Sequence, residues 1–278
     1  MPELPEMQAL AERVEAEFGG AALKRATPIQ FSSLKTFDPS PESLVGRTLT
    51  SVSRRGKFLI FDLDGPRMLI HLSQGGRVDF ERPVKASRPK HGVVRLVFDN
   101  GAGLLVKEFG TERKAGWWIL GDAEGDGPLE KLGPEPFSDE FEALILKGED
   151  GRRVHTLLRD QRTVAGIGRG FSDDILHHAR LSPYASLASL GEEERRRLIE
   201  ASHEILEEAL VKERTRTGGL PNKLQGRFVV HGHSGEPCPR CGVTLRRVSY
   251  ESHEIVYCPA CQTGGKILAD RRLSRLVR

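Results

Sequence analysis

The first segment of the chain repeats apolar residues with the period of a helix. The apolar positions lie three and four residues apart, at Met7, Leu10, Val14 and Phe18. This spacing places them on one face of an α-helix. Pro5 is suited to a first helical turn, and Gly19-Gly20 is suited to a helix end. The pattern predicts a helix that ends near residue 18.

Between residues 48 and 120 the pattern changes to short runs of β-branched, aromatic and aliphatic residues. The runs are TLTSVS, KFLIFDL, RMLIHL, RVDF, VVRLVF, GLLVK and WWIL, separated by Gly, Asp, Asn and Pro. Short runs divided by turn residues are typical of antiparallel sheets. We expect a β-sandwich here.

Pro and Gly cluster at 126–136, and the pattern beyond them is helical. We expect helices at 139–147 (with Ser138 as N-cap), 153–160, 172–180 (beginning at Ser172) and 190–213 (opened by a Ser189/Glu192 capping box). The stretch 214–236 is Gly-rich, basic and aperiodic, which indicates a mobile loop.

A chain of 278 residues is long enough for more than one core. The fold class predicted is α+β. The expected domains are a β-sandwich with a leading helix (1–132), a helical domain (133–235), and a cysteine module with a basic tail (236–278).

All the cysteines of the chain lie in two C-x-x-C pairs separated by sixteen residues: Cys238, Cys241, Cys258 and Cys261. Four thiolates with this spacing can form a tetrahedral zinc site. LRRVSY and EIVYC, between and beside the pairs, predict two strands of a β-hairpin. We expect one structural Zn²⁺. The spacing leaves open whether the module also contacts a partner or only stabilises the fold.

The charge is unevenly distributed. Residues 211–278 hold thirteen Lys/Arg and five Asp/Glu, a net charge of +8, whereas residues 1–210 carry −5. A basic segment can be a solvated face or a surface for nucleic acid, and nucleic acid is the leading hypothesis. No apolar run approaches 18 residues and the N-terminus is acidic, so we expect a soluble cytoplasmic protein with no membrane partner.

Six blocks of sequence occur in an order shared with one known family. They are MPELPE, RRGKFLIF (54–61), HLSQGGR (71–77), LGPEP (132–136), DQRTVAGIGRGFSDDIL (160–176), and GEPCPRCG with YCPACQ near the end. On these motifs the chain resembles the formamidopyrimidine-DNA glycosylase and endonuclease VIII family. The resemblance covers essentially the whole chain.

The resemblance implies base-excision repair of DNA that contains a damaged base or abasic site, by a monomeric enzyme. Pro2 is the implied nucleophile once Met1 is removed, Glu3 the proton donor, Glu6 a supporting group, and Lys57 a catalytic or phosphate-binding lysine. A terminal amine has a reference pKa of about 8, against about 10.4 for lysine, so part of it is unprotonated at neutral pH. The alternatives are a plain helix start for Pro2-Glu3 and a solvated lysine at 57.

The resemblance also implies a DNA grip formed by a helix-two-turn-helix over 153–176 and the zinc finger. The DNA-binding positions that it indicates are His91, Arg113, Arg169 and His253. Some differ from the residues common in the family. Arg169 replaces an Asn and His253 an Arg, and His155 stands where a Lys is common, with a solvated helix residue as its alternative.

Two further differences concern the space that a flipped base leaves. Gln74 replaces a common Met, and Thr111 to Ala115 lack an aromatic wedge. The loop 214–226 corresponds to a region that covers the flipped base in some members.

Three hypotheses follow. The chain is a glycosylase and lyase for oxidised purines such as formamidopyrimidines and 8-oxoguanine, the same chemistry directed at oxidised pyrimidines, or a non-catalytic protein that binds damaged DNA.

Overall fold

The computed structural model describes all residues except 111, 122–124, 223, 225, 251–252 and 270–278. The chain forms two compact units. Unit 1 comprises residues 1–131 and 210–224, and unit 2 comprises residues 132–209 and 225–278. No described helix combines the length and apolar character that a membrane span requires.

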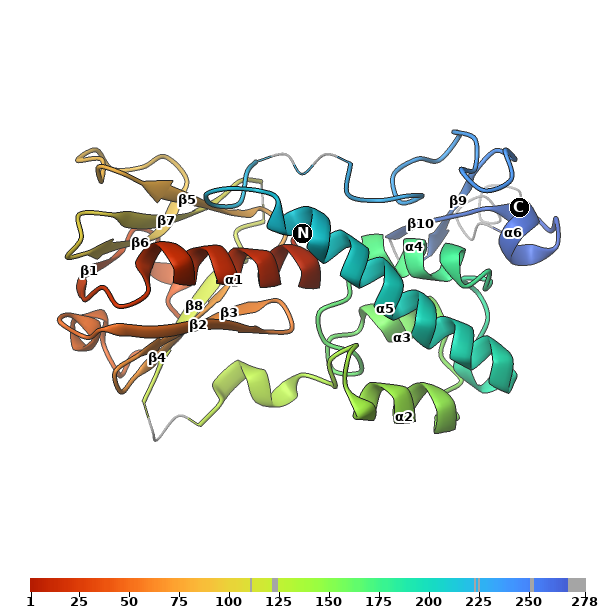
Figure 1. The fold of residues 1–278 in the computed structure, drawn as a ribbon, viewed down its shortest axis with the longest axis horizontal. Coiled ribbons are helices and arrows are strands. Elements are labelled where there is room, and N and C mark those ends of the chain that lie inside the picture. The colour runs from red at the N-terminus through yellow and green to blue at the C-terminus, as the bar shows by residue number, and fades with distance from the viewer. Residues whose placement is uncertain (111, 122–124, 223, 225, 251–252, 270–278) are drawn as a thin grey trace, which may run out of the picture. The chain divides into compact units, whose positions relative to one another are not determined.

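Unit 1 begins with helix α1 (Leu4–Phe18), which Figure 1 draws in red. Pro5 lies in its first turn, and Glu3 and Glu6 form a reciprocal capping box there. The predicted apolar face is fully buried, with Met7, Leu10, Val14 and Phe18 each 0% exposed. The predicted leading helix is therefore confirmed, and it packs into the core of the unit.

Two four-stranded antiparallel sheets form the predicted sandwich. One sheet has the order β1 (Leu23–Pro28), β6 (Gly92–Phe98), β7 (Gly103–Glu108), β5 (Gly76–Glu81). The other has the order β2 (Leu49–Arg55), β3 (Phe58–Leu63), β4 (Arg67–His71), β8 (Gly116–Leu120). Apolar residues of both sheets share one core with α1.

Strand β1 is the element of the sandwich that the pattern of apolar residues misses. It pairs only with β6 among the described strands, and its sequence LKRATP buries just Leu23 and Ala26. An edge strand with two polar residues side by side has no clear alternation.

Unit 2 contains helices α2 (Asp139–Lys147), α3 (Val154–Arg159), α4 (Arg169–His178) and α5 (Glu192–Arg214). Ser138 caps α2 as predicted, because its side chain accepts a hydrogen bond from the amide of Phe141. The last residues of α5, from Leu210, belong to unit 1.

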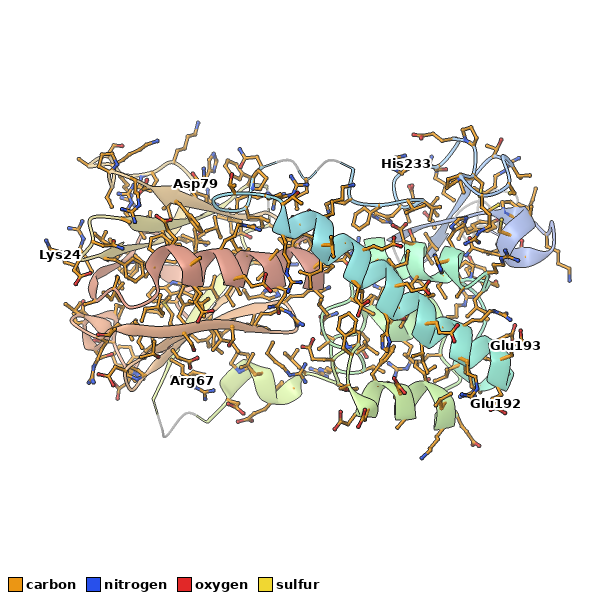
Figure 2. All side chains as sticks on the ribbon, in the orientation of Figure 1. Lys24, Arg67, Asp79, Glu192, Glu193 and His233 are labelled. Atoms are coloured by element: carbon orange, nitrogen blue, oxygen red, sulfur yellow. The ribbon has the colours of Figure 1, made fainter. Side chains whose placement is uncertain are left out.

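Two predicted helix starts are wrong. Helix α4 begins at Arg169, and Ser172 is buried inside it, where its hydroxyl donates to the carbonyl of Gly168. The N-terminal cap of α5 is formed by Gly191, whose amide donates to Glu194 at 3.0 Å; Ser189 instead donates to Ser186. The side chains of Glu192 and Glu193 project from this first turn into solvent (Figure 2).

The cysteine module ends the described chain. Strands β9 (Arg246–Tyr250) and β10 (His253–Tyr257) form the predicted antiparallel hairpin, and the short helix α6 (Pro259–Thr263) follows. The predicted α+β class, with a sandwich, a helical region and a cysteine hairpin, is confirmed.

Candidate active site and metal centre

The N-terminal residues are held inside the protein. Pro2 is buried, and Glu3 and Glu6 are 3% and 0% exposed. The amide of Glu3 donates to Glu6 Oε2 at 2.8 Å. The positive end of the helix dipole stabilises carboxylates at this position. An ordinary surface helix start would leave these groups in water, so their burial gives this end of α1 a defined geometry.

Lys57 lies in the tight turn between β2 and β3, beside Gly56, whose φ of +57° suits glycine. The lysine is only 5% exposed, which rules out the solvated alternative. The same hairpin is tied to α1, because Arg54 Nε donates to Gln8 Oε1 at 3.1 Å and Arg54 Nη1 to the carbonyl of Gly56. A cation is thus held on the strand pair that packs beside the start of α1.

The pKa of His71 on β4 is affected by burial and by the charge of this lysine. Desolvation, and secondarily the positive charge of Lys57, lower the pKa of His71 to about 4. The His71 ring stacks on Phe58 with centroids 4.7 Å apart. At neutral pH the imidazole is therefore neutral.

A cavity of about 670 Å³ in unit 1 brings together several predicted positions. Gln74, Arg77, Phe109, Glu112 and Asn222 line it. Phe109, which the sequence reasoning missed, places an aromatic ring beside Gln74. Its only signal was an aromatic residue just before the stretch where the family has its wedge.

The predicted DNA contacts His91 and Arg113 both neighbour residues that line this cavity, Phe109 and Glu112. His91 is exposed, has a φ of +63°, and its ring lies 5.3 Å from that of Phe109. Arg113 is also exposed, next to the ion pair of Glu112 and Lys114.

The segment 215–222 has no helix or extended strand, as predicted, but it is anchored to the sandwich. Leu220 is fully buried in the core of unit 1 and exchanges backbone hydrogen bonds with Val78 on β5. Arg77 also donates to the carbonyl of Asn222. The mobility expected from its composition is therefore restricted at these residues.

In unit 2 the turn before α4 is shaped by Gln161. Its amide donates to the carbonyls of Arg159 and Ile167 and accepts from the amide of Gly166. Arg169, the predicted phosphate contact, is the first residue of α4 and is half-buried. The turn therefore directs a basic residue and a helix N-terminus to the same place.

The solvated alternative for His155 is wrong. The residue is 1% exposed, and its Nε2 lies 3.1 Å from Asp173 Oδ1. The second oxygen of Asp173 contacts His231 Nδ1 at 2.6 Å and accepts from the amide of Val256 at 3.1 Å. Asp173 thus joins α3, α4, the chain at residue 231 and the cysteine hairpin.

Asp174, the neighbouring carboxylate, holds the chain that leads to the cysteines. It accepts hydrogen bonds from the amides of Val229, Val230 and His231. Burial raises the pKa of Asp174 to about 6, and the amides oppose this shift because they favour the anion.

The four cysteine sulfurs lie within 4.8 Å of one another. Cys238 and Cys261 Sγ are 4.0 Å apart, and Cys241 and Cys258 Sγ are 3.5 Å apart. A tetrahedron of sulfurs around Zn²⁺ has edges of about 3.8 Å, from the usual Zn–S bond of about 2.3 Å. The cluster therefore has the dimensions of a closed Cys₄ zinc site.

Neighbouring groups orient these ligands. His177 Nε2 contacts Cys238 Sγ at 3.2 Å, and burial lowers the pKa of this histidine to about 4. Gln262 accepts from the amide of Cys258 and donates to the carbonyl of Leu181. His253, the predicted contact of the finger, begins β10, but its side chain lies outside the described residues, as does the turn before it.

Comparisons with known proteins cover nearly all of the chain. Residues 1–118 match the family described as formamidopyrimidine-DNA glycosylase N-terminal domain, and residues 132–218 match the formamidopyrimidine-DNA glycosylase H2TH domain. The formamidopyrimidine-DNA glycosylase of Chloroflexus aurantiacus is 32% identical over 277 residues, which cover 94% of this chain and 98% of the relative.

Solved structures give the same result. The complex of Lactococcus lactis Fpg with DNA containing an abasic site aligns with a TM-score of 0.83 and 26% identity, over 94% of this chain and 99% of that one. The complex of wild-type Lactococcus lactis Fpg (MutM) with DNA containing an oxidized pyrimidine aligns at 0.85 and 27%, over 94% and 100%. The chain therefore belongs to the formamidopyrimidine-DNA glycosylase family.

Proposed function

We propose that this protein is a base-excision repair enzyme, a DNA glycosylase that also cleaves the strand at the abasic site. The observation that supports this most is the burial of Pro2 and Glu3 in a fixed geometry at the start of α1. The chain also aligns over nearly all its length with relatives named for this activity.

Pro2 acts as the nucleophile after removal of Met1. Its secondary amine attacks C1′ of the damaged nucleotide and the bond from C1′ to the base breaks. The base leaves with the proton that the amine gives up. Glu3 donates a proton to the sugar ring oxygen as the ring opens. The resulting iminium withdraws electrons, so that the C2′ proton can be removed and the 3′ phosphate expelled; a second elimination expels the 5′ phosphate.

Lys57 holds a phosphate next to the reacting sugar. A lysine held at 5% exposure is a cation placed before the ligand arrives, and such a cation stabilises the negative charge of a phosphate. Glu6 keeps the Glu3 backbone in place through the capping box.

We propose that three segments of the chain have different roles in binding and cleaving DNA. Residues 1–132 carry the chemistry, 133–235 hold one side of the lesion through Arg169, and 236–278 hold the backbone through the finger and His253. His91 and Arg113 contribute phosphate contacts from the sandwich. The enzyme acts as a monomer in a bacterial-type cytosol, in keeping with its bacterial relatives.

One Zn²⁺ is the proposed occupant of the Cys238, Cys241, Cys258 and Cys261 cluster. The sulfur spacing fits it, and all four ligand positions are protein thiolates, which leaves no open position for catalysis. The ion would supply folding free energy to the β9–β10 hairpin.

The proposed substrates are oxidised purines, including formamidopyrimidines and 8-oxoguanine. Oxidised pyrimidines are the second candidate, because Gln74 replaces the common Met in the cavity and a related enzyme was solved with an oxidized pyrimidine. The change at Gln74 alters the lining of this cavity, whereas Pro2, Glu3 and Lys57 do not line it.

A panel of duplexes with single lesions tests the proposal. Cleavage and borohydride trapping are measured on 8-oxoguanine, formamidopyrimidine, oxidised-pyrimidine and abasic duplexes. The wild type should cleave and trap, and Pro2→Gly should do neither. Pro5→Ala, which changes the other proline of the same turn, is the matched control and should trap. Binding without cleavage or trapping by the wild type would favour the non-catalytic alternative.

A further inference from the structure

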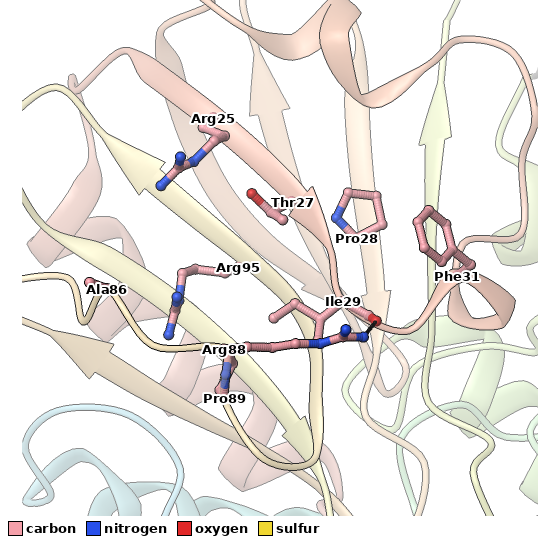
Figure 3. Close-up of a pocket in the computed structure, with 9 residues that line it drawn as sticks. All are labelled: Arg25, Thr27, Pro28, Ile29, Phe31, Ala86, Arg88, Pro89 and Arg95. Atoms are coloured by element: carbon pink, nitrogen blue, oxygen red, sulfur yellow. Dashed lines mark hydrogen bonds between the residues drawn. The ribbon is translucent and has the colours of Figure 1, made fainter.

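A separate cavity of about 420 Å³ lies on the sandwich, between the end of β1 and the loop 82–91 that leads into β6 (Figure 3). None of the residues proposed for catalysis or DNA binding lines it. One wall of the cavity is fixed by close packing around Gly92. Gly92 sits where a Cβ would come within 2.8 Å of both Ile29 and Pro89, so only glycine lets these side chains close together. The amide of Ile29 also donates to the carbonyl of Val93.

Three arginines and no acidic residue line this cavity. The charge of Arg95 is already neutralised by an ion pair, because its Nε lies 2.9 Å from Glu81 Oε2. The side chains of Arg95 and Glu81 are 10% and 5% exposed. The side chain of Arg25 is exposed and, within the described part of the chain, makes no hydrogen bond or ion pair. Arg88 makes one hydrogen bond, to the carbonyl of Ile29 at 3.2 Å. The cavity therefore offers two guanidinium groups without a carboxylate partner among the described residues.

Apolar residues complete the lining of the cavity. They are Pro28, Ile29, Pro89 and Phe31, and Figure 3 shows Phe31 at the end away from Arg25. The Phe31 ring is 81% exposed. Exposed aromatic rings beside arginines are enriched at protein interfaces, where the ring gains by losing water and the arginine binds a carboxylate with paired hydrogen bonds.

We propose that this cavity is a docking site for an acidic peptide segment of a partner protein. Carboxylates of the segment pair with Arg25 and Arg88, and an aliphatic or aromatic side chain packs between Ile29 and Phe31. A nucleic-acid strand fits less well, since such strands are bound along a groove with successive aromatic rings, whereas this cavity has one ring and otherwise proline and aliphatic walls.

Peptide binding to the full-length protein tests this. The probe is a fluorescent hexapeptide, Glu-Asp-Leu-Phe-Asp-Glu, followed by anisotropy at low salt. The wild type should bind it, and Arg25→Glu or Arg88→Glu should weaken binding at least about tenfold, as expected when one charged pair is replaced by repulsion. Phe31→Ser should weaken it about fivefold or more. Because all three side chains are exposed, the melting temperature should not change.

Lys24→Glu is the matched control. Lys24 is the exposed neighbour of Arg25 on β1, lies outside the cavity and projects to solvent (Figure 2), so this variant should bind the peptide within about twofold of wild type. Equal losses at Lys24 and Arg25 would mean nonspecific attraction and would overturn the proposal. So would undiminished binding of a peptide with Ser-Ser in place of Leu-Phe, or preferential binding of a single-stranded decanucleotide at Arg25. Lesion cleavage, measured in parallel, should be unchanged in all these variants.

Discussion

Burial of His71, with the positive charge of Lys57 as the smaller cause, makes the stability of unit 1 depend on pH. The folded imidazole has a pKa of about 4, whereas the unfolded one titrates near its usual 6.5. Below pH 6.5 the unfolded chain binds a proton that the folded chain does not. This histidine therefore leaves the free energy of unfolding unchanged above pH 6.5 and lowers it progressively as the pH falls toward 4.

We expect His71→Phe to remove this dependence. The replacement keeps a ring against Phe58, and its advantage over the wild type should grow to about 2–3 kcal/mol between pH 6.5 and pH 4. Tryptophan fluorescence during urea unfolding measures this, because both tryptophans of the chain, Trp117 and Trp118, lie on β8 in unit 1. A constant difference between the two proteins over that range would refute the assignment.

Helix α4 holds the cysteine hairpin through one buried carboxylate. Asp173 accepts from the Val256 amide on β10 and contacts His155 and His231. We expect Asp173→Ala to destabilise unit 2 by about 3 kcal/mol, because it leaves two imidazoles and an amide without their acceptor. Chemical unfolding followed by circular dichroism measures this. Asp139→Ala, at an exposed position in α2, is the control and should cost under about 1 kcal/mol; an equal cost would contradict the network's role.

Elements with a strong local pattern could be predicted from the sequence, and those fixed by distant contacts could not. Helix α1 and the β9–β10 hairpin follow from apolar spacing and paired cysteines. The start of α4 does not, because Gly170 is a poor helix former and the turn depends on Gln161.

The candidate site shows the same division. The motifs identify Pro2, Glu3 and Lys57, but their burial depends on packing of α1 and the hairpin. His155 was misread because its partner Asp173 lies 18 residues away in the sequence. Phe109 was missed because only the folded chain brings it to Gln74.

The charge of the whole molecule should govern its binding to DNA. The last 68 residues carry a net charge of +8, so affinity should fall steeply with salt. Arg169→Ala should reduce the slope of log K against log salt by about 1, as expected for the loss of one phosphate contact. Arg196→Ala, an exposed arginine of α5 paired with Glu192, should leave the slope unchanged. Titrations of an abasic duplex at several salt concentrations decide this, and equal slopes for wild type and Arg169→Ala would contradict the contact.

The central claim is that the secondary amine of Pro2 forms the covalent intermediate. The most direct measurement is borohydride trapping on an 8-oxoguanine duplex, followed by proteolysis and mass spectrometry of the peptide that carries the nucleotide. We predict that the adduct lies on an N-terminal peptide that begins with Pro2 and lacks Met1. An adduct on Lys57 or any other lysine, or on a chain that retains Met1, would contradict it.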